Sequence, residues 1–136
     1  MGTNDANSAN KGKLIYPELS YAVTGLCFNV HNELGPYAKE KQYADLLEAK
    51  LKERGMRHQR EYRIANTGNQ VDFLVEDKLI LELKAKRMLT KEDYYQTQRY
   101  LQESGIRLAF LVNFRNKYIK PVRIIRIDRS GKAQAL

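Results

Sequence analysis

The run LILELKA, residues 79–85, contains two charged side chains in an otherwise apolar stretch. Side chains two positions apart in an extended strand point to the same face, so Glu82 and Lys84 would share one face. The other residues of the run are apolar, which indicates a buried strand. A carboxylate and an ammonium group at the end of a buried strand cost stability unless something pairs with them. A buried ion pair, a solvent-facing edge strand and a functional site are the three interpretations that this triplet leaves open.

A second carboxylate, Asp72, precedes this run in NQVDFLVEDK. A strand over residues 70–75 and a tight turn at residues 76–78 would fold Asp72 back toward Glu82. Two convergent carboxylates suit Mg²⁺ or Mn²⁺, because these hard cations prefer oxygen ligands. A lysine beside the cation, here Lys84, would hold a water molecule or neutralise charge on a phosphate. Aspartate is disfavoured in strands, and we interpret Asp72 as a metal ligand, with the capping of a turn as the alternative.

The rest of the sequence predicts two helices before this hairpin and one after it. Apolar residues follow helical spacing over residues 17–34 and 38–54, and Thr90 begins a third helix that ends near Ser104. Strands are predicted over residues 57–65, 70–75, 78–85, 106–114 and 122–127. The order α-α-β-β-β-α-β-β predicts an α/β protein with a mixed sheet, in which the apolar strand 106–114 is parallel to a neighbour.

The arrangement of Asp72, Glu82 and Lys84 on a β-hairpin resembles the PD-(D/E)xK nuclease superfamily, whose core has the order βββαβ. The segment HNELGPYAKEKQYADLLEAKLKERG resembles the GxxExxY family, a small-domain branch of that superfamily. Its Glu and Tyr are Glu40 and Tyr43 here, and Tyr37 stands where its first glycine is expected. The likeness extends from about residue 15 to residue 127.

The resemblance implies a restriction-endonuclease-like fold and metal-dependent hydrolysis of phosphodiester bonds. Asp72, Glu82 and the backbone carbonyl of Leu83 would bind Mg²⁺ or Mn²⁺, and Glu40 would assist as a further acid or ligand. Lys84 would orient the attacking water or stabilise charge on the phosphate.

A second part of the resemblance lies on the third helix. Gln96 and Tyr100 form a QxxxY pair similar to that of RecB-type and lambda-type exonucleases. Residues four apart share one helical face. Gln96 would position Lys84 or the scissile strand, and Tyr100 would support it. An exposed polar helix is the alternative interpretation of this segment.

Charge is distributed unevenly along the chain. Residues 1–83 contain 11 Lys and Arg and 12 Asp and Glu, a balance of −1, whereas residues 84–136 contain 13 and 4, a balance of +9. The two balances sum to the net charge of +8. A basic half suggests a polyanionic partner, although basic domains that bind no nucleic acid are also common. We expect nucleic acid as the partner, DNA rather than RNA, contacted by Lys86, Arg87, Arg99, Arg115 and Lys117.

The C-terminal segment YIKPVRIIRIDRSGK contributes to this charge. Its basic residues alternate with valine and isoleucine. In an antiparallel edge strand, such an alternation predicts a basic face on one side of the strand.

Length and composition are those of one soluble domain of 136 residues. We expect residues 1–13, which are small and polar, to form a disordered leader and residues 14–136 to form the domain. No apolar run approaches the length of a membrane span. The single cysteine, Cys27, fits a reducing compartment, hence the cytoplasm, and its position indicates a buried helix face.

Other functions remain compatible with this sequence. The chain could be a nucleic-acid-binding or assembly module that has the fold without catalysis, or it could hydrolyse a small nucleotide. Because the domain is minimal, specificity could come from a partner or from a homodimer.

Overall fold

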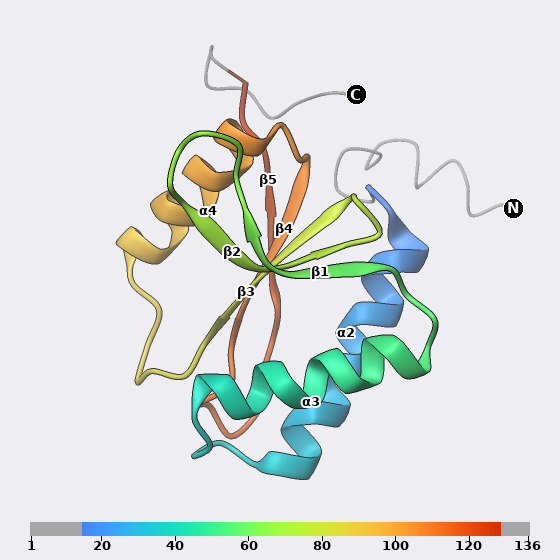
Figure 1. The fold of residues 1–136 in the computed structure, drawn as a ribbon. Coiled ribbons are helices and arrows are strands. Elements are labelled where there is room, and N and C mark those ends of the chain that lie inside the picture. Colours follow the sequence, from blue (N-terminus) through green and yellow to red (C-terminus); the bar gives the residue numbers. More distant parts are fainter. Residues whose placement is uncertain (1–14, 129–136) are drawn as a thin grey trace, which may run out of the picture.

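A five-stranded sheet lies between two helices on one face and a single helix on the other in the computed structural model, which describes residues 15–128 (Figure 1). The helices are α2 (Pro17–Leu34), α3 (Glu40–Glu53) and α4 (Lys91–Ser104). The strands are β1 (His58–Arg63), β2 (Gln70–Val75), β3 (Leu79–Lys84), β4 (Leu108–Asn113) and β5 (Val122–Ile125). The predicted α/β class and element order are confirmed, and the ends of the elements differ from the prediction by at most two residues.

The strands lie in the order β1-β2-β3-β4-β5. Strands β3 and β4 are parallel, and every other neighbouring pair is antiparallel. The parallel pair requires a crossover, and α4 supplies it on one face of the sheet. The mixed sheet and the parallel strand over residues 106–114 are therefore as predicted.

Strand β3 lies in the middle of the sheet and contributes to two cores. Leu79, Leu81 and Leu83 pack with α2 and α3, whereas Ile80 packs with α4. The alternation predicted from the sequence is thus present, and it assigns Glu82 and Lys84 to the α4 side. Both layers of helices are needed to cover this strand.

Both ends of α4 are defined by capping residues. The backbone N–H of Thr90 donates to Oδ2 of Asp93 at 2.7 Å, so the side chain three residues into the helix satisfies the N-cap. Gly105, with a φ of 76°, ends the helix in the left-handed conformation that glycine tolerates best. Both ends of the helix follow from sequence signals.

The predicted one-sided basic face of the last strand is wrong. Arg123 donates a hydrogen bond to Oγ of Ser20 in α2 at 2.8 Å, whereas Arg126 donates to the carbonyl of Gly105, behind α4. Arg123 lies in β5, whereas Arg126 follows the end of this strand at Ile125, so the two side chains do not share one strand face. Both side chains therefore brace the helices that cover the sheet.

Two other expectations concern burial and the termini. Cys27 is buried in the helix face as predicted, and burial raises the pKa of its thiol to about 12. Within residues 15–128, no helix has the length and apolar composition needed to cross a membrane. The leader expected over residues 1–13 lies outside the described residues.

Candidate active site

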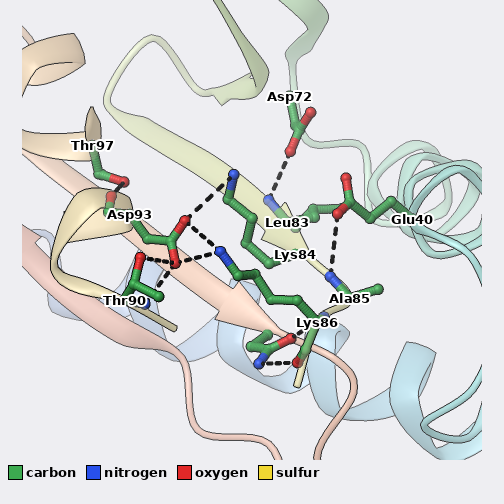
Figure 2. A network of polar contacts seen from close by, with 10 residues as sticks. Glu40, Asp72, Leu83, Lys84, Ala85, Lys86, Thr90, Asp93 and Thr97 are labelled. Atoms are coloured by element: carbon green, nitrogen blue, oxygen red, sulfur yellow. Dashed lines mark hydrogen bonds and ion pairs between the residues drawn. The ribbon is translucent and has the colours of Figure 1, made fainter. Parts of the chain in front are cut away.

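Strands β2 and β3 separate at the point where their two carboxylates lie. The backbone pairing of β2 with β3 extends as far as Phe73 and Leu81. Beyond this pair, side-chain carboxylates accept the hydrogen bonds of backbone N–H groups. The N–H of Asp72 donates to Oε1 of Glu82 at 2.9 Å. The N–H of Leu83 donates to Oδ2 of Asp72 at 2.7 Å (Figure 2). The predicted convergence of Asp72 and Glu82 is therefore observed, and we call this arrangement the carboxylate fork.

The backbone changes direction at the fork. Val71 and Leu74 belong to the core beneath α4, whereas Phe73 and Val75 belong to the opposite core, so the alternation of β2 shifts at Asp72. In β1, Arg60 pairs with Phe73 and Tyr62 with Val71, which places Glu61 opposite Asp72.

Glu61 itself has a φ of 53°. This value is rare outside glycine, and such strain is concentrated at functional sites.

Burial and mutual repulsion shift both acids of the fork toward the neutral form. Glu82 is only 7% exposed, and its burial, followed by the charge of Asp72, raises its pKa to about 8. Burial also raises the pKa of Asp72. The hydrogen bond from the N–H of Leu83 lowers this pKa, and the charge of Glu40 raises it further. Neither acid has a cationic side chain within 4 Å among residues 15–128. The fork is therefore a place where a cation would be stabilised.

Glu40 reaches the same region from the first residue of α3. Its Oε2 accepts the N–H of Ala85 at 3.3 Å, just beyond the end of β3 (Figure 2). A cleft of about 280 Å³ opens beside it and is lined by Glu40, Lys41, Ala44, Arg60, Glu61, Asp72 and Leu83. Glu40 and Asp72 thus face one solvent-accessible space, with Glu82 behind them.

Lys84 lies on the α4 side, where it forms an ion pair with Asp93 in the first turn of α4, a residue that no sequence pattern linked to the site. The Nζ of Lys84 is 3.9 Å from Oδ1 of Asp93, and the Nζ of Lys86 lies 2.8 Å and 3.0 Å from the two oxygens of that carboxylate (Figure 2). Burial alone would raise the pKa of Asp93, but hydrogen bonds from Lys86 and Thr90 hold it below its usual range. Asp93 is therefore an ionised carboxylate that pairs closely with Lys86 and more loosely with Lys84.

Asn113 is a second residue that the sequence analysis missed. It is buried at the end of β4, opposite Lys84 in the parallel register. Its side chain accepts the N–H of Lys86 at 3.1 Å and donates to the carbonyl of Lys86 at 2.8 Å. This pair of bonds fixes the backbone after β3. No local signal marks Asn113, because its partner is 27 residues away.

The two residues of the QxxxY pair share a face of α4 but differ in burial. Tyr100 is buried in the core beneath α4, where burial and then the charge of Glu82 raise its pKa. Gln96 is half-buried, and within residues 15–128 its side chain has no hydrogen-bond partner. In the described part of the chain, no hydrogen bond joins Gln96 to Lys84, whose amine lies 3.9 Å from Asp93, and the alternative contact of Gln96 with the scissile strand stays a prediction.

The five basic residues expected to bind nucleic acid differ in their surroundings. Lys86 is engaged by Asp93 and is half-buried. The other four are exposed: Arg87, Arg99, Arg115 and Lys117. Arg115 and Lys117 follow β4, whose end lies beside the end of β3, so two of them are at the edge of the sheet that carries the site.

The donor set of the fork fits a hard divalent cation. The described residues contain no group of three or more His, Cys, Asp and Glu that could hold a metal on side chains alone. A cation here would rest on Asp72 and Glu82, completed by the carbonyl of Leu83, by water and by a phosphate. Mg²⁺ is usually held in this way, by one or two carboxylates and its substrate.

Comparison with known proteins agrees with this geometry. A family model described as the PD-(D/E)XK nuclease superfamily matches residues 17–127, which is most of the chain. The chain therefore belongs to the PD-(D/E)XK nuclease superfamily. Comparisons with curated proteins and with solved structures gave no match.

Proposed function

We propose that this protein is a divalent-metal-dependent nuclease that hydrolyses phosphodiester bonds in nucleic acid, DNA in preference to RNA, in the cytoplasm. The carboxylate fork carries the proposal. It holds two acids that repel each other, without a cationic partner within 4 Å among residues 15–128, beside a cleft that is open to solvent. Membership of the superfamily supports this chemistry. The positions of Glu40 and Tyr43 support narrower membership of the GxxExxY family.

Three acidic side chains would bind the cation together. Asp72 and Glu82 would bind Mg²⁺ or Mn²⁺ with the carbonyl of Leu83, and Glu40 would contribute directly or through water from the cleft. When bound, the cation would neutralise phosphate charge and lower the pKa of a water molecule. The hydrogen bonds from Asp72 N–H and Leu83 N–H leave one oxygen of each carboxylate for this role.

Lys84 would act on the phosphate. Its ammonium group would orient the attacking water or stabilise the charge that develops as the water oxygen bonds to phosphorus and the leaving oxygen departs. Asp93 would act as a positioning residue, because it holds the amine at the α4 side of the fork. Tyr100 would pack behind Glu82, and Gln96 would contact the substrate strand from α4.

A cleavage assay tests the proposal. Labelled single- and double-stranded DNA and RNA are incubated with Mg²⁺, Mn²⁺ or EDTA, using the wild type and the variants Glu82→Ala and Lys84→Ala. We expect cleavage that requires the metal and falls by at least about 100-fold in both variants, the scale of one lost electrostatic group. Glu18→Gln, on the exposed start of α2, is the matched control. Cleavage that persists in both variants of well-folded protein would refute the proposal.

A binding or assembly module with the same fold is the second candidate. The observation that favours it is the ion pair of Lys84 with Asp93, because this carboxylate would compete with a phosphate for the amine. Within residues 15–128, the side chain of Lys84 also has no hydrogen bond to Gln96. This candidate predicts nucleic-acid binding in EDTA and no cleavage of any of the four substrates. The same assay therefore separates the two.

A further inference from the structure

Two tyrosines, one in the loop before α3 and one in the loop after β4, are largely exposed. Tyr37 is 80% exposed and Tyr118 is 79% exposed. Tyrosine usually buries its ring, because the ring carries a large apolar area. Each ring also has a cation on it: the guanidinium of Arg115 lies 5.2 Å from the centre of Tyr37, and Nζ of Lys117 lies 5.4 Å from the centre of Tyr118. These four residues form what we call the tyrosine–cation platform.

The platform lies at the edge of the sheet that carries the site. Tyr37 is three residues before Glu40, which contacts the end of β3. On the other side, the N–H of Phe114 donates to the carbonyl of Lys84 at 2.8 Å, and Arg115 follows directly. Both loops of the platform are therefore attached to residues of the proposed active site.

Both loops are also held in place. Tyr43 is buried and stacks on Phe114, with 4.4 Å between ring centres and 14° between ring planes. The Tyr43 hydroxyl donates to the carbonyl of Gly35 and accepts the N–H of Ala38. The other loop is fixed at Asn116, whose carbonyl is 2.8 Å from Nε2 of His31. Rings on anchored loops need little further ordering when they bind a ligand.

We propose that the tyrosine–cation platform binds unpaired nucleotides, so that the substrate of the proposed active site is single-stranded nucleic acid. Aromatic rings bind single strands by stacking on bases, and basic residues beside them hold the phosphates. With a cation on one face and about four-fifths of Tyr37 exposed, the other face of the ring is free for a base. Bases inside a duplex are stacked on each other and do not offer that face. This inference rests on the proposed function, because it names the substrate class of the same site.

The platform is less suited to a protein partner than to a polyanion. Each of its two rings lies beside a cation, and the part of the chain from residue 84 has a balance of +9. Aromatic rings beside basic residues match the bases and the phosphates of a single strand together. The combination of ring and cation therefore favours a nucleic-acid strand.

Binding in EDTA tests the proposal without cleavage. Fluorescence anisotropy is measured for a labelled 20-nucleotide DNA single strand, the same sequence as RNA, and the DNA duplex. We expect both single strands to bind more tightly than the duplex. Tyr37→Ala and Tyr118→Ala should each weaken single-strand binding by about five- to 100-fold, and Tyr37→Phe should restore it, because stacking needs the ring and not the hydroxyl. The two single strands show whether DNA or RNA is the source of the unpaired bases.

Tyr21→Ala is the matched control, because Tyr21 is 85% exposed but lies in the first turns of α2. The rise of the helix places it about 20 Å along α2 from the end that leads to Tyr37. Equal binding by the two alanine variants and the wild type, duplex binding as tight as single-strand binding, or an equal loss in Tyr21→Ala would overturn the inference. Tyrosine-dependent single-strand binding without cleavage in any metal would refute only the nuclease. Metal-dependent cleavage of the duplex that is unchanged in Tyr37→Ala and Tyr118→Ala would refute only the role of the platform.

Discussion

At the scale of single residues, Glu82 and Asp72 combine burial with like charge. Taking a carboxylate out of water disfavours its charged form, and a second carboxylate beside it adds to the penalty. The backbone N–H groups that donate to the two acids offset this only in part. Such a pair of carboxylates is stabilised by a bound cation or by a proton. Without a cation, the stability of the folded protein is therefore expected to depend on pH.

The stability of the metal-free protein is expected to fall as pH rises. The pKa of Glu82 is about 8 in the folded protein against 4.5 ordinarily, so the folded state binds more protons than the unfolded state between these values. The contribution is fully present below pH 4.5 and is lost as pH rises through 8. In EDTA, Tm should fall over this range by on the order of 10 °C, and Glu82→Gln should remove most of the slope. A slope unchanged in Glu82→Gln, with Glu18→Gln as control, would contradict the environment described for Glu82.

Asp93 should matter for catalysis because of its hold on Lys84. Asp93→Asn removes the charge that anchors Lys84 and Lys86, so kcat should fall by about tenfold or more with KM little changed, as for a misplaced catalytic group. Asp93→Glu should restore part of kcat. Thr97→Val is the matched control, because Thr97 Oγ1 donates to the backbone carbonyl of Asp93 at 2.9 Å and does not touch its carboxylate. An equal loss of kcat in both variants would indicate a structural effect only.

At the scale of elements, the β2–β3 hairpin fixes where the acids meet. Its turn has Glu76 and Asp77 at φ of 54° and 58°, although tight hairpin turns with two positive φ values favour Asn-Gly or Asp-Gly. The sequence predicts the turn from its position between two strands, but not this strained conformation. The ion pairs of Arg57 with both acids are exposed and contribute little.

Replacing Asp77 by glycine should stabilise the protein. Glycine adopts a φ of 58° without the steric cost of a side chain, which is about 1 kcal/mol, and the lost exposed ion pair is worth less. We expect Tm to rise by a few degrees. Asp77→Ala removes the same ion pair and keeps the strain, so it should not raise Tm. A higher Tm in both variants would mean that the carboxylate, rather than the backbone, is unfavourable.

The elements also show what the sequence could and could not predict. Alternation in LILELKA and helical spacing in α2 and α3 are local, and they gave the element order, the mixed sheet and the convergence of Asp72 with Glu82. The Lys84–Asp93 contact depends on how α4 lies across the sheet, which no local pattern encodes. The different directions of Arg123 and Arg126 likewise depend on where β5 ends, at Ile125, and on the residues of α2 and of the α4 C-cap that accept their hydrogen bonds.

At the scale of the whole molecule, one edge of the sheet concentrates acids, lysines and exposed cations. If the four exposed basic residues Arg87, Arg99, Arg115 and Lys117 contact phosphates, binding of a single strand should be strongly salt-dependent. For three or four contacts, affinity should fall by about 20- to 50-fold between 50 mM and 200 mM salt. Anisotropy titrations at several salt concentrations measure this slope. A slope near zero would mean that phosphates are not bound.

Mn²⁺ binding measured by calorimetry shows whether Asp72 and Glu82 form the cation site. We predict one bound ion for the wild type and for the control Glu18→Gln, and loss of at least about tenfold in affinity for both Asp72→Asn and Glu82→Gln. These variants keep the shape of the side chain and remove its charge. Mn²⁺ binding that is equally tight in both variants, with the fold intact by circular dichroism, would contradict this assignment.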